Sequence, residues 1–207
     1  MIRRTIILVV LMGGVLALAW FNPPPLPEKP VNPRFVKIAP DGRELGAWEG
    51  PWSCVLDKHT GLIWEVKSYA EDMHDYQCSF SWFDGYTGVA GGGSCFTKNG
   101  KSDTRDLVEY TNETKRCGIV GWRLPTEQEL GSLLSETPLP GDLLIDRDYF
   151  PYVQRGLYWT SNAEVPLTGY FKRLDKGAIS IDFKDGSHRE MPYRDTAFVR
   201  LVADNDQ

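Results

Sequence analysis

The N-terminal segment, residues 1–21, constrains the rest of the chain most, because its pattern is that of a segment that inserts into a membrane. Arg3 and Arg4 precede the uncharged run Thr5–Phe21. Charged side chains are costly inside a bilayer and arginines stay on the cytoplasmic side, so this order predicts that the chain beyond the run lies outside the cytoplasm. An Ala-Leu-Ala step ending at Ala19 suits signal peptidase, whereas the length of the run suits a retained anchor. A cleaved signal peptide and a transmembrane anchor both remain open.

Residues 22–47 are predicted to be a proline-rich linker that leads to one globular domain over residues 48–207. Seven prolines lie between positions 22 and 40. Since proline fixes φ and removes a backbone donor, such a stretch favours an extended spacer. The chain is 42% hydrophobic and 12% aromatic, which is enough apolar surface to fill a core and excludes a mainly disordered protein.

Four cysteines in the globular region are predicted to form two disulfides. Their number is even, and an exported domain folds in an oxidising compartment, where such cysteines pair. Sequence alone allows three connectivities, of which we favour Cys54–Cys117 and Cys78–Cys95, because the second bridge closes the glycine-rich segment 91–93. The cysteines are too widely spaced for a zinc site, which usually contains close C-x-x-C pairs.

The pattern of the globular region predicts a single α+β domain in which two helices pack on antiparallel strands. Ser53–Leu56 and Leu62–Val66 are typical of a β-hairpin. One helix is predicted over Thr104–Arg116, and a capping box, Thr126–Glu129, opens a second helix. Four further strands are predicted in the second half of the chain: Tyr158–Ser161, Gly169–Leu174, Ala178–Lys184 and Ala197–Val202.

Four segments of the globular region, taken together in this order, resemble one protein family. They are Trp52–Asp57 (WSCVLD), Thr60–Lys67 (TGLIWEVK), Cys117–Thr126 (CGIVGWRLPT) and Tyr158–Ser161 (YWTS). The set resembles the C-terminal domain of collagen-like bacterial adhesins, the Lcl C-terminal domain family, over most of the chain. The resemblance implies an exported, often membrane- or lipid-attached protein, and the best-understood family member binds sulfated glycosaminoglycans and supports adhesion. The motifs are also similar to those of C-type-lectin-like and formylglycine-generating-enzyme folds, which implies a C-type-lectin-like domain.

The chain departs from these adhesins in its charge and in its repeats. It has no collagen-like Gly-X-Y region, and its net charge is -5, whereas a sulfated polymer would require a basic surface. An acidic chain also lacks a global basic field for nucleic acid, so no nucleic-acid partner is expected.

The sequence contains no catalytic or metal-binding motif, so we expect no enzyme activity, no metal and no cofactor. H-x-x-x-H, H-E-x-x-H and G-x-S-x-G are missing, and no glycine-rich phosphate loop follows a predicted strand. A formylglycine-generating enzyme works through a reactive cysteine pair, and here disulfides account for all four cysteines. Three carboxylates in one predicted loop are interpreted as solvated side chains rather than as a calcium site: Asp142, Asp146 and Asp148.

The segment Ser79–Lys101 is the predicted ligand-binding surface. Trp82 and Tyr86 would stack on a sugar or on a partner protein, and Lys98 and Lys101 would attract acidic groups. The alternative is that Trp82 and Phe83 fold back and cover a small core beneath the glycine-rich loop.

Other motif residues have structural interpretations. Arg123 is expected to form an ion pair with Glu65 or Asp57. Three motif tryptophans are expected in the core rather than in a sugar-binding platform: Trp64, Trp122 and Trp159.

Together these features predict a non-catalytic binding or adhesion module of the bacterial cell envelope. The domain would be periplasmic or surface-exposed and would recognise a glycan or an envelope protein. The alternatives are a structural subunit of an envelope assembly and, third, an enzyme of the formylglycine-generating type. The N-terminal segment would contact the membrane, and a homo-oligomer is left open.

Overall fold

The computed structural model describes residues 31–97, 100–135 and 141–205 of the chain. The predicted membrane segment and residues 22–30 of the predicted linker lie outside these residues. Within the described part, no helix is both long enough and apolar enough to cross a membrane.

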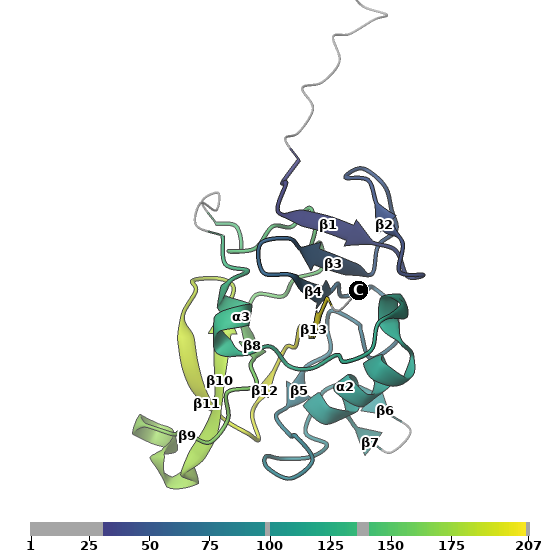
Figure 1. Ribbon diagram of the computed structural model, residues 1–207. Helices are drawn as coiled ribbons and strands as arrows, with labels where there is room; N and C mark the ends of the chain where they lie inside the picture. The colour runs from purple at the N-terminus through teal and green to yellow at the C-terminus, as the bar shows by residue number, and fades with distance from the viewer. Residues whose placement is uncertain (1–30, 98–99, 136–140, 206–207) are drawn as a thin grey trace, which may run out of the picture. The chain divides into compact units, whose positions relative to one another are not determined.

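The largest sheet contains five strands in the order β13-β4-β3-β1-β2 (Figure 1). Its centre is the predicted hairpin, in which β3 (Cys54–Asp57) and β4 (Leu62–Glu65) pair antiparallel. Gly61 in the connection has a φ of +72°, which glycine adopts without strain. β13 (Val202–Asp204) pairs with β4. All four side chains of β4 are buried, so this strand is covered on both faces.

The predicted linker of residues 22–47 is wrong in its second half, which forms two strands. They are β1 (Phe35–Ile38) and β2 (Glu44–Leu45). β1 pairs with β3 over its whole length, and β2 pairs with β1, so the globular unit begins before β1. Phe35 and Ile38 are buried, which stabilises the added strand through the hydrophobic effect. The surrounding prolines concealed this short strand, because a high proline density indicates a linker.

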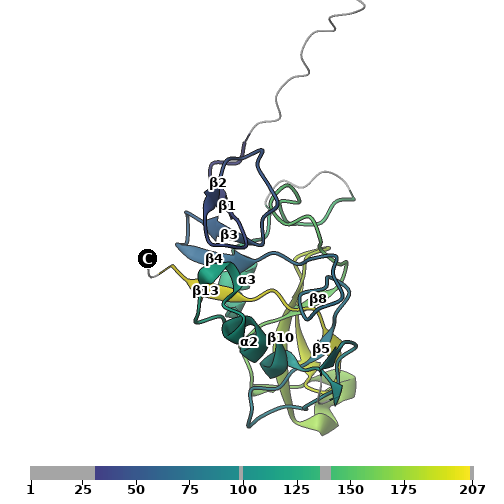
Figure 2. The same cartoon turned by 90° about the vertical axis from the view of Figure 1, so that its right-hand side faces the viewer.

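A second sheet covers the other end of the domain (Figure 2). It contains β8 (Leu157–Trp159), β10 (Lys176–Asp182) and β11 (His188–Pro192), and the short β9 (Val165–Pro166) pairs with the start of β10. α3 (Glu127–Gly131) packs against β10. Both helices of the prediction are thus present, and this one begins at the predicted capping box.

Two of the four strands predicted in the second half of the chain differ from the structure. Gly169–Leu174 forms a 3₁₀-helix, η2, and Asp175 after it has a φ of +63°. An alternating pattern forms a strand only where a neighbouring strand can pair with it, and this segment extends beyond the sheet (Figure 1). The predicted strand Ala197–Val202 is divided between β12 (Thr196–Ala197) and β13, with the fully buried Arg200 between them.

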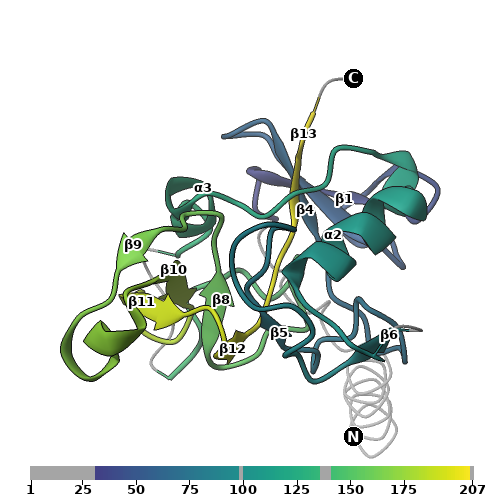
Figure 3. The ribbon, with the colours of Figure 1, turned by 90° about the horizontal axis from the view of Figure 1, so that it is seen from below.

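α2 (Thr104–Glu113) confirms the other predicted helix, although it ends three residues before Arg116. Its N-cap is Asp103, whose carboxylate accepts the N–H of Asp106, while the Asp106 carboxylate accepts the N–H of Asp103. Two short strand pairs lie beside α2 (Figure 3). They are β5 (Phe80–Ser81) with β12, and β6 (Phe96–Thr97) with β7 (Gly100–Lys101).

Both predicted disulfides, Cys54–Cys117 and Cys78–Cys95, are present. The first connects β3 to the turn after α2, and the second connects the segment before β5 to the residue before β6. The mixture of helices and antiparallel sheets confirms the α+β class, while the C-type-lectin-like comparison stays a prediction. The three motif tryptophans are buried, as predicted: Trp64, Trp122 and Trp159.

Candidate functional site

Trp82 belongs to the core and not to a contact surface. Its side chain is only 3% exposed. The indole Nε1 donates a hydrogen bond to the carbonyl oxygen of Thr160 at 2.8 Å, and the ring lies 5.1 Å from the ring of Tyr193. This corrects the stacking role predicted for Trp82 and supports the alternative, in which the residue covers a core beneath the loop.

The other predicted ligand residues do not lie with Trp82 on one surface. Tyr86 is 98% exposed and Lys101 is exposed on β7, whereas Lys98 lies outside the described residues. The glycine-rich segment 91–93 is tightly packed. A Cβ atom added to Gly93 would lie 2.3 Å from the carbonyl oxygen of Ser102.

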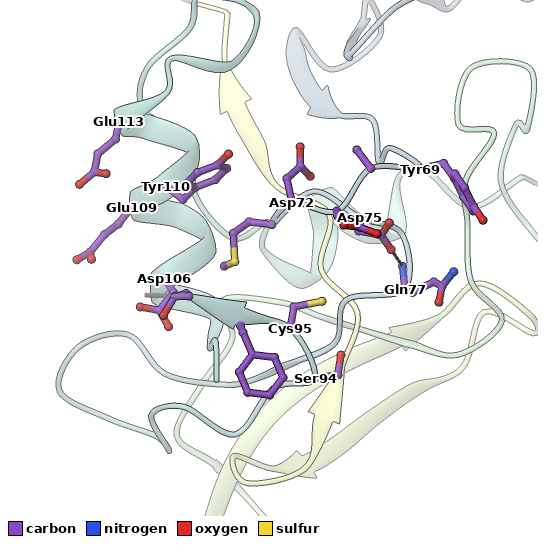
Figure 4. A pocket seen from close by; sticks show the side chains of 15 residues that line it. Tyr69, Asp72, Asp75, Gln77, Ser94, Cys95, Asp106, Glu109, Tyr110 and Glu113 are labelled. Atoms are coloured by element: carbon purple, nitrogen blue, oxygen red, sulfur yellow. Dashed lines mark hydrogen bonds between the residues drawn. The ribbon is translucent and has the colours of Figure 1, made fainter. Parts of the chain in front are cut away.

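A hollow of about 1180 Å³ opens beside α2 (Figure 4). We call it the acidic hollow, and it is lined by residues from the segments 69–77, 94–97 and 106–113. Among the described residues that line it, none is Lys, Arg or His, and six carry carboxylates: Glu71, Asp72, Asp75, Asp106, Glu109 and Glu113. Because the whole chain has a net charge of only -5, this surface concentrates the negative charge of the protein.

One wall of the acidic hollow is a single face of α2. Asp106, Glu109, Tyr110 and Glu113 follow an i, i+3, i+4, i+7 spacing, which places their side chains on one side of a helix (Figure 4). Leu107 on the other side is fully buried. The apolar contact fixes the helix, so the carboxylates are held in place before any ligand binds.

The opposite wall is the loop of residues 69–77. The carboxylates of Asp72 and Asp75 each accept the backbone N–H two residues further along, at 2.8 and 2.7 Å. These Asx-type turns shape the loop without neutralising the carboxylates. The Cys78–Cys95 bridge then holds the end of the loop against segment 94–97.

Aromatic rings lie among the carboxylates of the acidic hollow. Tyr69 and Phe96 are each 72% exposed, and Tyr69 stacks on Tyr76 with ring centroids 5.7 Å apart. Exposed rings of this kind present flat apolar faces to a ligand. The site therefore combines negative charge with stacking area.

The carboxylates of the acidic hollow repel one another. Burial, the largest cause, raises the pKa of Asp106 above its ordinary value, and the charges of Asp103 and Glu109 raise it further. Glu109 pairs with Arg105 at 2.5 Å, whereas Glu71 forms no ion pair within the described residues. A cation in the hollow would relieve this repulsion. In the same described part, no group of three metal-ligating side chains is placed to hold a metal ion.

A buried charge cluster lies behind the α2 wall. Oε1 of the fully buried Glu65 is 2.8 Å from Nζ of Lys67 and 2.7 Å from Nδ1 of His74. Burial acts to raise the pKa of Glu65, but Lys67 and the hydrogen bond from His74 outweigh it and hold that pKa well below its ordinary value. Burial lowers the pKa of His74, whose Nδ1 donates because an ionised carboxylate only accepts. The His74 ring lies 5.5 Å from that of Tyr110 in the hollow wall.

Arg123 does not pair with Glu65 or Asp57, as the sequence had led us to expect. Its guanidinium donates to both carboxylate oxygens of Glu129 at 2.8 Å and to Asp204 at 3.0 Å. The backbone of Arg123 pairs with β13, which places its side chain beside the end of that edge strand. Glu65 and Asp57 are fully buried and are bound by other cations.

The comparisons with known proteins agree with the motif analysis. The Lcl C-terminal domain family matches residues 53–203. The chain belongs to this family. No curated protein and no solved structure matches it. Family membership suggests an adhesin-like extracellular module.

The sequence motifs of this Lcl C-terminal domain form helices and strands of the fold and do not line the acidic hollow. TGLIWEVK contains β4, GWRLPT leads into α3, and YWTS contains the end of β8. None of the described residues that line the acidic hollow belongs to these three motifs.

The acidic hollow was not predicted from the sequence, although two local signals for it exist. The carboxylates of Asp106, Glu109 and Glu113 share one face of a helix whose position was predicted. A second acidic stretch lies at residues 71–75. Their meeting depends on tertiary structure, since the loop, the disulfide and the helix have to be placed together first.

Proposed function

We propose that this Lcl C-terminal domain is a non-catalytic binding module of the bacterial cell envelope. It would be held outside the cytoplasm by the N-terminal segment, and the acidic hollow would be its recognition surface. The partner would be a glycan or an envelope protein that carries positive charge beside an apolar or sugar face. The observation that carries this proposal is the set of six carboxylates and exposed aromatic rings around one hollow.

Charge argues against the sulfated ligand that the family resemblance implies. Sulfate groups would meet carboxylates at the acidic hollow, and like charges at an interface cost affinity. An ammonium-bearing ligand would instead gain electrostatic attraction and would stack on Tyr69 or Phe96. Amino sugars without acetyl groups and lysine-rich peptides both have this chemistry.

Catalysis has less support than binding. All four cysteines of the chain are in disulfides, so none is free for the cysteine chemistry of a formylglycine-generating enzyme. The buried His74 is engaged by Glu65, which suits a structural role.

Isothermal titration of the full-length protein tests the proposal. We expect binding of oligolysine and of deacetylated glucosamine oligomers, weakening as salt rises, and no binding of heparin fragments or acetylated oligomers. Glu71→Gln/Glu113→Gln should weaken binding about tenfold, because each exposed charge contributes up to about 1 kcal/mol. The matched control, Glu44→Gln/Glu190→Gln, removes two exposed carboxylates that do not line the hollow and should leave affinity unchanged. Heparin binding with no response to the cationic probes would contradict the proposal.

A structural subunit of an envelope assembly is the second candidate function. The observation that favours it is the exposed segment 168–175, which contains Lys172 and Arg173 and lies on the side of the domain away from the acidic hollow. Two surfaces of opposite charge on one domain suit assembly.

A further inference from the structure

A basic and aromatic arm, residues 168–175, extends from the second sheet between β9 and β10 (Figure 1). It consists of Thr168, the 3₁₀-helix η2 and Asp175. Tyr170 in the arm is 92% exposed and its ring lies 5.3 Å from that of Phe171, and Lys172 and Arg173 are also exposed. An exposed ring beside two exposed basic side chains offers a partner both an apolar face and positive charge.

The arm has a fixed base and internal bonds. β9 pairs with the start of β10 below it, and a Cβ added to Gly177 of β10 would lie only 2.0 Å from the carbonyl oxygen of Met191, so the base is closely packed. Within the arm, the N–H of Phe171 donates to the carbonyl of Thr168, and the N–H of Asp175 donates to that of Lys172. A segment held in this way loses little conformational entropy when it binds.

The charges of the arm are not neutralised within its own chain. In the described part of the protein, neither Lys172 nor Arg173 forms an ion pair. Asp175 is the only acidic residue among residues 168–175, which leaves the arm with a net positive charge. The acidic hollow has the opposite composition, with six carboxylates and no basic lining residue among those described.

The arm and the acidic hollow lie on opposite sides of one domain. Figures 1 and 3 show the arm beside β9 on one side and α2 with β6 on the other. The arm therefore cannot occupy the hollow of its own chain, but a second copy can present one.

We propose that the arm of one copy of this chain occupies the acidic hollow of a second copy. Lys172 and Arg173 would meet carboxylates of the α2 wall, and Tyr170 would pack against Phe96. The hollow, at about 1180 Å³, is large enough to accept several side chains. The contact joins two different surfaces, so it is head-to-tail, and each added copy brings a further arm and a further hollow until the assembly closes into a ring or ends. The inference rests on the proposed function, since it names the partner of the same hollow.

Sedimentation of the full-length protein in a neutral detergent tests this head-to-tail contact. Wild type should associate beyond the dimer at low salt, and association should weaken at high salt. The arm variant Lys172→Glu/Arg173→Glu and the hollow variant Glu71→Lys/Glu113→Lys should each associate at least tenfold more weakly. The matched controls Lys58→Glu/Arg147→Glu and Glu44→Lys/Glu190→Lys should behave as wild type, and equal melting temperatures would show that all variants fold.

Mixing the two variants gives the sharper result. One intact arm and one intact hollow remain in the mixture, so association that is lost in each single variant should be restored. Zero-length carbodiimide cross-linking of a mixture of isotope-labelled and unlabelled wild-type protein should join the amine of Lys172 to a carboxylate of the hollow, with loss of water, in mixed-isotope pairs. Mixed variants that stay monomeric, or association that persists in both single variants, would overturn the inference.

The self-association of the protein and its binding of oligolysine can be tested separately, so the inference and the proposed function can fail independently. The arm variant retains its hollow, so it should bind oligolysine as wild type does, and oligolysine should dissociate wild-type assemblies. Oligolysine binding by a protein that stays monomeric would overturn the inference and leave the proposed function standing. A wild-type protein that neither binds oligolysine nor associates would overturn the inference and the proposed function together.

Discussion

Trp82 and Tyr86 are separated by three residues and lie in opposite environments, one in the core and one in solvent. Both are aromatic and both lie near the glycine-rich segment, so their residue types alone gave them the same predicted role. Burial separates the two. Trp82 is held by packing and by a hydrogen bond to Thr160, whereas the backbone N–H of Tyr86 donates to Asp84 in an exposed turn.

Alanine substitution at these two positions should give very different stabilities. Trp82→Ala should lower the free energy of unfolding by about 3–5 kcal/mol, because it leaves a large cavity. Tyr86→Ala should change it by less than about 0.5 kcal/mol, as is usual for an exposed side chain. Urea unfolding followed by circular dichroism measures both. Equal effects would contradict the assignment of Trp82 to the core.

The buried charge cluster at Glu65 shows which residue-scale features the sequence could not supply. The sequence analysis predicted Arg123 as a partner of the Glu inside the strand TGLIWE, and that pairing is not present. The partners are Lys67, two positions along, and His74, from the loop of the hollow. Several basic residues are available to any carboxylate in a chain of this composition, so the pairing depends on the tertiary fold.

At the scale of elements, α3 shows how a local motif fixes a boundary. The Thr126 hydroxyl accepts the N–H of Glu129, and the Glu129 carboxylate accepts the N–H of Thr126. That carboxylate also binds Arg123 through both oxygens. The capping box was predictable because its four residues are adjacent, and the ion pair was missed because the direction of the Arg123 side chain depends on β13.

Glu129→Gln should weaken this helix start in a pH-dependent way. The hydrogen bond from Arg123, followed by that from the N–H of Thr126, lowers the pKa of Glu129 from 4.5 to about 2 against the effect of burial. A depressed pKa means that the stabilisation is full above about pH 4.5 and is lost as the pH falls towards 2. The variant should be less stable by about 1 kcal/mol at pH 7, a value limited by solvent screening.

Urea unfolding at several pH values measures the difference in the free energy of unfolding between wild type and Glu129→Gln. This difference should shrink as the pH falls from 4.5 towards 2. Glu190→Gln, on the exposed face of β11, is the control and should show no such trend. A difference that stays constant down to pH 2.5 would contradict the role of the ion pair.

Elements built from neighbouring residues were predictable, and those that need a distant partner were not. The β3–β4 hairpin and both helices were found, because their periodicity and caps are local. β1 was missed and η2 was taken for a strand, because the presence of a pairing strand decides both cases. The same limit applies to the acidic hollow, whose walls come from separate segments.

At the scale of the whole molecule, two disulfides connect parts that are distant in sequence. Cys54–Cys117 closes a loop with a sequence separation of 63, and Cys78–Cys95 closes one of 17. Only the second contributes to the acidic hollow, because Cys95 lines it and Cys78 directly follows the 69–77 loop. The first bridge lies beyond the end of α2, which is also held by the buried Leu107 and by the bond from the Asn112 side-chain amide to the Trp122 carbonyl.

Removing each bridge should therefore separate stability from binding. By loop entropy, Cys54→Ala/Cys117→Ala should cost up to about 4 kcal/mol and Cys78→Ala/Cys95→Ala up to about 3 kcal/mol, since the longer loop regains more freedom when unfolded. Oligolysine affinity should fall in the opposite order, because only the second variant releases the wall formed by residues 69–77 from segment 94–97. Urea unfolding and titration of the same samples measure both quantities, and wild type without reductant is the reference. If the Cys54–Cys117 variant lost as much affinity as the Cys78–Cys95 variant while remaining folded, the acidic hollow would not be the site of binding.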